Sequence, residues 1–223
     1  MPVVTKADIQ AVTNVLESGW ISSSSPVIAE FEATWKKLIP SSSWLTVSNG
    51  TVALQLALKS IGIGPGSIVG VPDVTFAATI NAVLEIGATP IILPVNTSLL
   101  LDTDYILRSR PAVDAIICVG LYNNTNDFES LKNISNQLSC EIILDWAEVN
   151  PLNPNVSLFA SHFITTFSFF ANKFLTTGEG GIVGFPEEFL YQKARIIRDH
   201  GMDPAKRYWH IAHGSNYRMT AMQ

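Results

Sequence analysis

The residue best suited to chemistry in this sequence is Lys173, which lies among aromatic and small residues within Phe167–Gly181. Ser168 supplies a hydroxyl five positions before it. A glycine-rich turn at 178–181 then precedes the apolar run Ile182–Phe185. A lysine amine attacks carbonyl carbons only in its neutral form, so surroundings that lower its pKa make it a nucleophile. On the local pattern alone, a surface lysine at a strand-to-loop junction remains the competing interpretation.

Asp145 is a second candidate because it stands at the end of the apolar run Glu141–Leu144. A carboxylate is costly to bury in such a place unless a cation meets it. A protonated pyridine nitrogen is such a cation, and keeping that nitrogen protonated makes the ring an electron sink. A helix N-cap or a metal ligand are the alternative roles for this aspartate.

The turn Asn49-Gly50-Thr51 is a candidate anion site because it opens a predicted helix directly after a predicted strand. Free backbone N–H groups and the positive end of the helix dipole attract anions there, and glycine lets a phosphate approach the backbone. A plain helix cap by Asn49 or Thr51 explains the same residues. The turn is not a Walker loop, because no lysine follows its glycine.

Short apolar runs alternate with helical patterns from Trp44 onward, which favours an α/β fold with a mainly parallel sheet covered on both faces. Ligands of such sheets bind beyond the carboxyl ends of the strands, so Asn49–Thr51 and Asp145 are expected at one edge. The predicted strands are Trp44–Val47, Ile68–Val71, Pro90–Leu93, Ala115–Val119, Glu141–Leu144, Phe163–Phe169 and Ile182–Phe185. The helices predicted between them are Thr51–Ile61, Thr75–Ile86, Asp127–Leu138 and Glu187–Asp199.

Residues 1–40 are expected to form a helical segment that precedes a single large domain at 41–223. Thr5 and Asp8 can cap a first helix, and a second begins at Pro26, since proline suits the first helical position. The apolar faces expected at helical spacing are Ile9, Val12, Val15 and Leu16 in the first helix and Ile28, Phe31, Trp35 and Leu38 in the second.

The composition, with 47% hydrophobic and 15% charged residues, describes a well-buried globular chain. A net charge of −5 gives no general attraction to nucleic acid or anionic membranes. Cys118 and Cys140 lie in apolar runs and are expected to be reduced core thiols. Without an apolar signal run the expected location is the cytoplasm, and no metal site is expected because the histidines lack zinc spacing.

Four motifs, in order and at similar spacing, resemble those of the DegT/DnrJ/EryC1/StrS family of pyridoxal-phosphate sugar aminotransferases, and within it the perosamine synthases. The resemblance covers about Ala7–Gln223. It implies the large domain of the fold-type I pyridoxal-phosphate transferases, a three-layer α/β fold. The motifs are Ser48–Leu54, Asp145–Glu148, Phe167–Gly181 and Asn216–Thr220.

The resemblance implies a role for each matching residue. Lys173 would hold pyridoxal phosphate covalently and move protons, and Asp145 would keep the ring nitrogen protonated. The further cofactor contacts that it implies are Gly50, Thr51, Val52 and Ser168 at the phosphate, Phe76 and Glu148 at the ring, and Asn216 at the phosphate bound by a neighbouring subunit. Without the resemblance, Phe76 is one more core aromatic and Asn216 a loop residue.

The implied reaction transfers an amino group, with glutamate as donor, to C4 of a nucleotide-linked 4-keto-6-deoxy sugar. It would be carried out by a homodimer and would serve polysaccharide biosynthesis, for example of O-antigen. Lys173 argues against the dehydratase branch of the family, which has histidine at this position. Gly201–Pro204 and Arg207–Trp209 are similar to the perosamine synthases and favour a GDP-linked sugar.

Three departures from the resemblance bear on activity. Relatives often have Gly-His or Gly-Gln where this chain has Asn123-Asn124 after Leu121-Tyr122. Asn150–His162 lacks the usual glycine-rich pattern. Relatives also continue past the position of Gln223 through the rest of the large domain and a small C-terminal domain. The alternative is therefore a truncated, weak or non-catalytic homologue that acts as a fold remnant or partner subunit.

Overall fold

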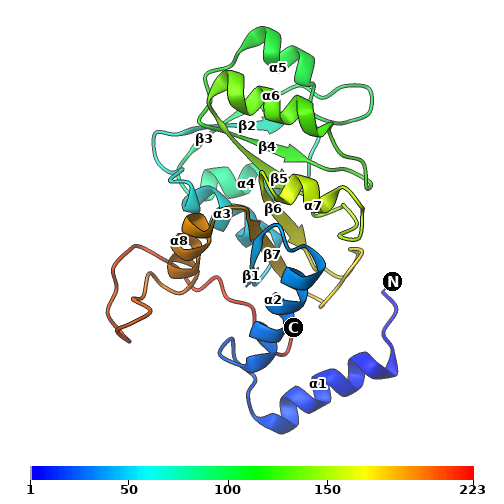
Figure 1. Ribbon diagram of the computed structural model, residues 1–223, viewed down its shortest axis with the longest axis vertical. Helices are drawn as coiled ribbons and strands as arrows, with labels where there is room; N and C mark the ends of the chain where they lie inside the picture. The colour runs from blue at the N-terminus through cyan, green and yellow to red at the C-terminus, as the bar shows by residue number, and fades with distance from the viewer. Residues whose placement is uncertain (1) are drawn as a thin grey trace.

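Seven strands form one sheet through the middle of the molecule, and the computed structural model describes residues 2–223. The strands are β1 (Ser43–Val47), β2 (Ile68–Pro72), β3 (Thr89–Leu93), β4 (Ala115–Val119), β5 (Glu141–Asp145), β6 (Ile164–Ser168) and β7 (Gly181–Phe185). Their order across the sheet is β1-β7-β6-β5-β4-β2-β3, as Figure 1 shows in part.

The sheet is mainly parallel, which confirms the prediction from the sequence. The pairs β2–β3, β2–β4, β4–β5 and β5–β6 are parallel, whereas β7 is antiparallel to both β1 and β6. Because β7 is reversed relative to both of its neighbours, β1 runs in the same direction as β6. The carboxyl ends of all strands except β7 therefore lie at the same edge of the sheet.

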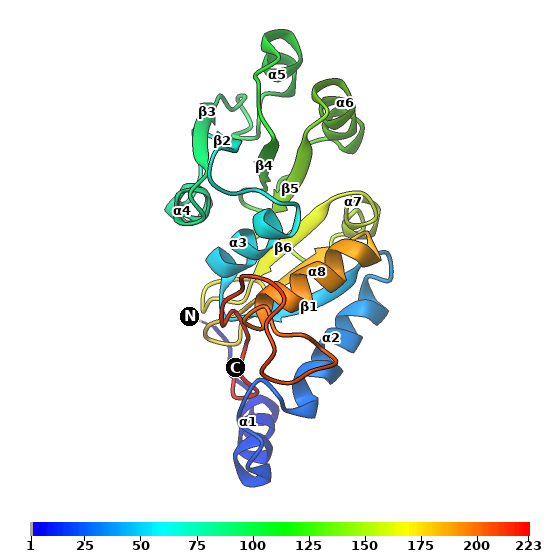
Figure 2. The same ribbon diagram turned by 90° about the vertical axis from the view of Figure 1, so that its left-hand side faces the viewer.

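Helices cover both faces of the sheet and make the three layers visible in Figures 1 and 2. They are α1 (Lys6–Ser18), α2 (Pro26–Leu38), α3 (Gly50–Ser60), α4 (Ala77–Glu85), α5 (Thr103–Ser109), α6 (Phe128–Leu138), α7 (Val156–Ala160) and α8 (Glu188–Arg198). One core cluster includes Leu54, Val83 and Ile197 from α3, α4 and α8. The other includes Trp35 and Ile134 from α2 and α6.

The expected strands and long helices are all present, with ends that shift by a few residues. The sequence pattern does not predict the short helices α5 and α7. Seven and five residues are too short to display a helical period clearly. Cys118 and Cys140 are free and buried, as expected, and burial raises the pKa of the Cys140 thiol to about 11. Within residues 2–223, no helix has the length and apolar character needed to cross a bilayer.

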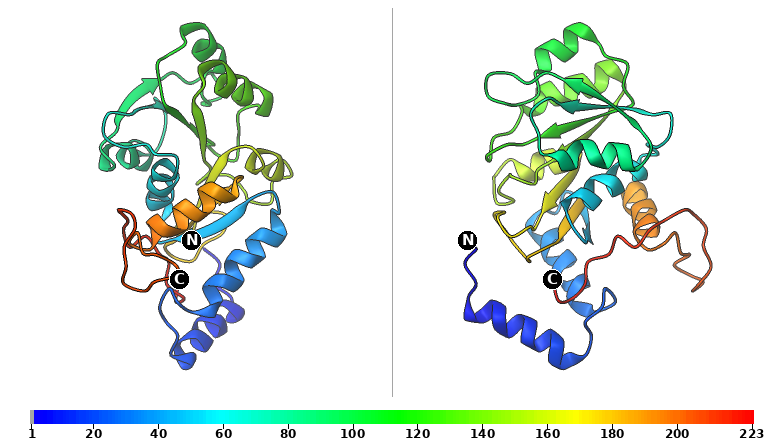
Figure 3. Two further views of the ribbon diagram at one scale, coloured as in Figure 1. Left: turned by 60° about the vertical axis from the view of Figure 1, so that its left-hand side comes forward. Right: turned by 180° about the vertical axis from the view of Figure 1, so that it is seen from behind.

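Of the apolar face expected on α1 only Val15 is buried, which corrects the prediction for the other three residues. Thr5 and Asp8 form the expected capping box, but Ile9, Val12 and Leu16 are 60%, 41% and 52% exposed. These side chains are exposed because α1 projects away from the sheet and does not pack against it (Figures 1 and 3). The prediction for α2 is wrong at Leu38, which was expected to face the core but is 48% exposed.

Candidate active site

The turn between β1 and α3 is a helix cap that also leaves two backbone donors free. The Asn49 side chain accepts a hydrogen bond from the Val52 N–H at 2.9 Å, so the capping interpretation of Asn49 is correct. Within residues 2–223, no acceptor bonds the N–H groups of Gly50 and Thr51. The cap and the anion site are compatible, because capping uses the third N–H group and leaves the first two without a partner.

Ser168, at the end of β6, lies directly against Gly50. A Cβ added to Gly50 would stand 2.9 Å from the Ser168 Cβ and 3.1 Å from its Oγ, so the contact requires glycine. The sheet explains this proximity, since Val47 and Ser168 both pair with Gly181 of the strand between them. The predicted phosphate contacts therefore share one corner of the sheet edge.

Asp145 ends β5 and is 6% exposed. Its Oδ2 accepts a hydrogen bond from Thr79 Oγ1 at 2.7 Å, and its Oδ1 accepts one from the Ala147 N–H at 3.3 Å. Burial raises the pKa of this carboxyl, while these two donors and the charge of Lys173 act in the opposite direction. Asp145 caps no helix, because the next one, α7, is preceded by Asn155.

No metal site explains Asp145 either. Among residues 2–223 there is no group of three or more His, Cys, Asp or Glu side chains that could hold an ion. Thr79 was not singled out from the sequence, although Thr75 and Thr79 at helical spacing offered a signal. Their hydroxyl oxygens lie 2.7 Å apart and form a short chain that ends at Asp145.

Lys173 lies between β6 and β7, in a connection that starts at the same sheet edge. Its Nζ is 3.5 Å from Glu148 Oε1, and its side chain is 18% exposed. Its positive charge also acts on Asp145, where it opposes in part the rise in pKa that burial causes. The structure thus brings the amine and both predicted carboxylates into one group. An isolated surface lysine, the competing interpretation, does not describe this position.

The loop after β4 holds Glu148 in place through backbone donors. The Tyr122 N–H bonds Glu148 Oε2 at 3.3 Å, and the Asn123 N–H bonds the Glu148 carbonyl at 3.0 Å. Tyr122 and Asn123 have φ values of +51° and +65°. Asparagine tolerates this left-handed conformation better than most residues, so Asn123 preserves the backbone where relatives often have glycine. Asn123 is therefore compatible with the backbone conformation that holds Glu148.

Phe76 and Asn216 are both exposed, and within residues 2–223 neither forms a hydrogen bond or ion pair with the Lys173 side chain. Phe76 stands at the start of α4 and is 77% exposed, so the alternative of a core aromatic is wrong. Asn216 pairs with Asp199 in an isolated bridge. The residue after it, Tyr217, accepts a hydrogen bond from the Ser48 N–H at 3.0 Å, which brings this segment next to the Gly50 turn.

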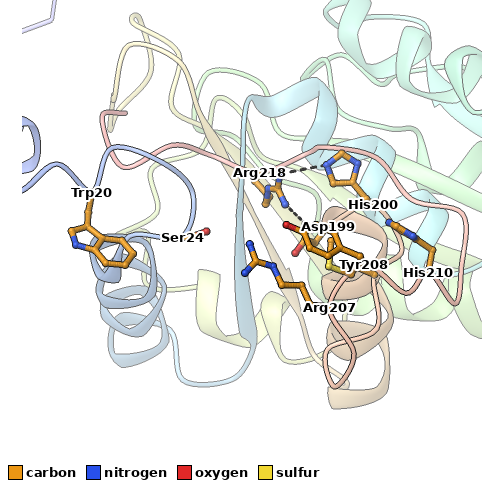
Figure 4. A pocket seen from close by; sticks show the side chains of 9 residues that line it. Trp20, Ser24, Asp199, His200, Arg207, Tyr208, His210 and Arg218 are labelled. Atoms are coloured by element: carbon orange, nitrogen blue, oxygen red, sulfur yellow. Dashed lines mark hydrogen bonds and ion pairs between the residues drawn. The ribbon is translucent and has the colours of Figure 1, made fainter.

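Two cavities of the described structure lie outside the sheet-edge group. One of about 840 Å³ is lined by residues of the α1–α2 joint and of the chain after α8, including Arg218 (Figure 4). The other, of about 760 Å³, lies near the ends of α3 and α4 and includes Lys59 and Ile86. Neither lining includes Lys173, Asp145 or Gly50.

Comparisons with known proteins show which family the chain resembles. The DegT/DnrJ/EryC1/StrS aminotransferase family matches residues 2–223. The chain is 37% identical over 224 residues to GDP-perosamine synthase of Escherichia coli O157:H7, covering 98% of this chain and 61% of that protein. The chain thus spans about three fifths of the length of this relative.

Solved structures show the same fold. The crystal structure of 3-amino-5-hydroxybenzoic acid synthase matches with a TM-score of 0.91 and 28% identity, covering 99% of this chain and 59% of that one. The structure of ntda from Bacillus subtilis, which has the cofactor PMP bound, matches with a TM-score of 0.90 and 27% identity over 99% of this chain and 52% of that one. A match along the described chain, on a sheet whose edge gathers a lysine, a buried aspartate and a glycine turn, shows that the chain belongs to the DegT/DnrJ/EryC1/StrS aminotransferase family.

Proposed function

We propose that residues 41–223, preceded by the helical segment 1–40, are the cofactor-binding part of a pyridoxal-phosphate sugar aminotransferase. The reaction moves an amino group from glutamate to C4 of a GDP-linked 4-keto-6-deoxy sugar, for polysaccharide biosynthesis such as that of O-antigen. The family, and the likeness to a GDP-perosamine synthase, support this proposal. The free, buried thiols Cys118 and Cys140 suit a reducing compartment and hence the cytoplasm.

The observation that carries the proposal is the convergence of an amine, a buried carboxylate and an anion turn at one sheet edge. Asp145 is buried, and neither of its hydrogen-bond donors is a cation, so a pyridinium nitrogen would supply the missing partner. The free N–H groups of Gly50 and Thr51, with Ser168 beside them, suit a phosphate. The residues present therefore fit pyridoxal phosphate at both ends of the molecule.

Pyridoxal phosphate, when bound, acts as an electron sink that allows an amino group to move between two carbonyl carbons. Lys173 Nζ is the group in reach that can hold the cofactor and then accept and return a proton at the reacting carbon. Glu148 holds the Lys173 ammonium in place through their 3.5 Å ion pair. Asp145 provides the negative charge for the ring nitrogen, and the exposed Phe76 side chain offers a stacking surface.

The test is the absorbance of the purified chain with pyridoxal phosphate, before and after borohydride reduction. Wild type should show a visible band of bound cofactor that reduction fixes to the protein. Lys36→Ala, which removes an exposed lysine of α2, should behave as wild type. Lys173→Ala should show neither the band nor the covalent product. If Lys173→Ala and wild type give equal spectra, the assignment of Lys173 is wrong.

The substrate is tested by turnover with glutamate and a panel of 4-keto-6-deoxy sugars linked to GDP, dTDP or UDP. Amination of the GDP-linked sugar ahead of the others supports the proposal. The family and the GDP-perosamine synthase relative do not favour the non-catalytic alternative, and the chain has Lys173, Asp145 and Gly50 at the positions that the proposal requires. A chain that binds the cofactor but aminates no sugar would favour that alternative.

A further inference from the structure

Thr79, in the first turn of α4, is a buried threonine whose hydroxyl bonds a residue outside its own helix. A threonine hydroxyl in a helix can bond the carbonyl four residues earlier, but Thr79 Oγ1 donates to Asp145 Oδ2 at 2.7 Å. The helix packs against α3, β2 and β3, and within residues 2–223 this is the one hydrogen bond that joins α4 to β5. The bond thus connects the start of α4 to the strand end that carries the candidate carboxylate.

The hydrogen bonds at Thr79 have a fixed direction when Asp145 is ionised. An ionised carboxylate only accepts, so the single proton of the Thr79 hydroxyl is donated to Asp145. The Thr75 hydroxyl, whose oxygen lies 2.7 Å from Thr79 Oγ1, must then donate to Thr79. Within residues 2–223 the Thr75 hydroxyl has no other hydrogen bond, and no side chain caps α4. Both hydroxyls are therefore directed to the carboxylate and not to the backbone of their own helix.

Thr79 differs from other buried hydroxyl residues in the group that it bonds. Four of them donate to neutral backbone carbonyls: Ser42, Ser60, Thr165 and Thr166. Thr46 bonds the carboxylate of Glu32, but that carboxylate is paired with Arg198. Asp145 forms no ion pair among residues 2–223. The Thr79 hydroxyl therefore donates to a buried carboxylate that has no cation bonded to it.

The Thr79 hydroxyl acts on both the orientation and the charge of Asp145. The last torsion of an aspartate side chain has broad minima, so a short bond to one oxygen fixes how the carboxylate plane lies. Burial raises the pKa of this carboxyl, and Glu148 adds to the rise. Among the groups that oppose the rise in pKa, the Thr79 hydroxyl acts most strongly, ahead of the Ala147 N–H and Lys173. The hydroxyl thus favours the ionised form of a carboxyl that burial disfavours.

The Asp145 carboxylate can still accept a further hydrogen bond. An ionised carboxylate offers about four lone-pair positions. Within residues 2–223 only two hydrogen bonds reach Asp145, from Thr79 and from the Ala147 N–H. A donor from outside the chain can therefore bond the carboxylate without loss of the Thr79 bond. Phe76, the candidate stacking residue, stands at the start of the same helix, so one helix start carries both the aromatic surface and the hydroxyl that orients the carboxylate.

We propose that Thr79 is the positioning residue of Asp145, and that its hydroxyl, supported by Thr75, holds the carboxylate ready for the ring nitrogen of the cofactor. Thr79 acts through Asp145 and not on the ring itself. This inference rests on the proposed function, because that function supplies the pyridine ring. Without the hydroxyl, the carboxylate turns more freely and is more readily protonated, and both changes weaken its hold on a protonated ring nitrogen.

The test compares the binding of pyridoxal phosphate with that of its deaza analogue, in which a C–H group replaces the ring nitrogen. Intact mass after borohydride reduction measures the fraction of chain that carries each compound. Thr79→Val keeps the shape but removes the hydroxyl, and should weaken the binding of pyridoxal phosphate about tenfold but leave that of the analogue unchanged. Thr79→Ser keeps the hydroxyl and should bind both compounds as wild type does. Thr165→Val, the same change at an equally buried threonine that bonds a backbone carbonyl, is the matched control.

A second measurement needs no cofactor, because the Thr79 bond stabilises the ionised form of Asp145 in the folded chain. Thr79→Val raises the folded pKa of this carboxyl further, so its loss of stability should grow as the pH rises from about 4 to about 8 in urea unfolding. Thr79→Ser and Thr165→Val should differ from wild type by amounts that do not depend on pH. Lys173 and Glu148, the other charged groups that act on Asp145, are unchanged in every variant.

The inference is overturned if Thr79→Val binds pyridoxal phosphate within about twofold of wild type, or if it loses affinity equally for the deaza analogue. Thr79 would then only fill space in the core. If Thr79→Val does not fold, Thr75→Val, which removes the donor to Thr79, should weaken pyridoxal phosphate alone by about threefold, and equal binding would overturn the inference. A wild-type chain that binds no pyridoxal phosphate would contradict the proposed function and the inference with it. Wild-type binding that no change at Thr79 affects would contradict the inference only.

Discussion

Asp145 is a buried carboxyl whose surroundings disfavour its charged form. Its carboxyl is buried at the end of β5, and burial raises its pKa above the ordinary value of 3.8. A carboxylate in such a position weakens the folded state when no cation faces it. We interpret this as a cost in stability that prepares the site for a cationic ring nitrogen. The hydroxyl and amide donors and the charge of Lys173 offset the burial of Asp145 only in part.

We predict that Asp145→Asn stabilises the cofactor-free chain at neutral pH by about 1–3 kcal/mol. A raised folded pKa means that the folded state binds the proton more tightly than the unfolded state. The stability that Asp145 contributes is therefore full below pH 3.8 and is lost as the pH rises through the raised folded value. Urea unfolding from about pH 4 to about pH 8 measures this, and the advantage of the variant should grow with pH.

The control for this prediction is Thr165→Ser, a conservative change at a buried threonine of β6 that alters no charge. Its difference in stability from wild type should be independent of pH. An Asp145→Asn variant that is less stable than wild type at every pH would show that the carboxylate is well compensated within the chain. The interpretation of a stored cost would then be wrong.

At the level of secondary-structure elements, the edge strand β1 is held by a largely buried ion pair. Glu32 of α2 accepts hydrogen bonds from the Thr46 N–H and Oγ1, both at 2.8 Å. Arg198 of α8 donates to the same carboxylate at 2.6 Å and to the Thr46 carbonyl at 2.9 Å. The outer edge of β1 is thus capped by side chains, which fixes the strand that leads into the Gly50 turn.

We predict that Glu32→Gln lowers the free energy of unfolding by about 3 kcal/mol, because it leaves Arg198 as a partly buried cation without a carboxylate. Urea unfolding at neutral pH measures the loss. Glu30→Gln, on the same helix at an exposed position, is the control and should change little. A Glu32→Gln variant as stable as the control would mean that the pair contributes nothing to holding β1.

At the scale of the whole molecule, two residues of the candidate site, Asn216 and Lys173, lie on different segments of the chain. Asn216 is exposed and lies on the segment beside Arg218, while Lys173 lies on the connection between β6 and β7. The proposed homodimer would place Asn216 at the cofactor phosphate of the neighbouring chain. Each site would then be built from two chains related by two-fold symmetry.

We predict that Lys173→Ala and Asn216→Ala chains, each inactive alone, regain activity when refolded together. In a mixed dimer one site carries both changes and the other carries neither, so random pairing restores about a quarter of the wild-type sites. Amination of the keto sugar measures the recovery. No recovery in a mixture that is shown to contain mixed dimers would mean that Asn216 does not act across the interface.

Local patterns along the chain were enough to predict the elements and the candidate residues. Strand runs and helical periods are local signals, so the alternation that predicts a parallel sheet could be recognised directly. The rule that ligands lie beyond the carboxyl ends of strands then placed Gly50 and Asp145 at one edge. The local pattern also singles out Lys173, although its assignment as the reactive amine depends on the resemblance to a family.

Which side chains meet could be learned only from the folded arrangement. The bond between Thr79 and Asp145 joins residues 66 positions apart, and the contact of Ser168 with Gly50 depends on strand order, so neither has a local signal. The connection at 169–180 has no helix, and β7 therefore returns antiparallel beside β6 and holds Lys173 at the edge. Burial also depends on the tertiary structure. The residues of α1 determine that the helix has an apolar face, but the position of the helix in the fold leaves most of that face exposed.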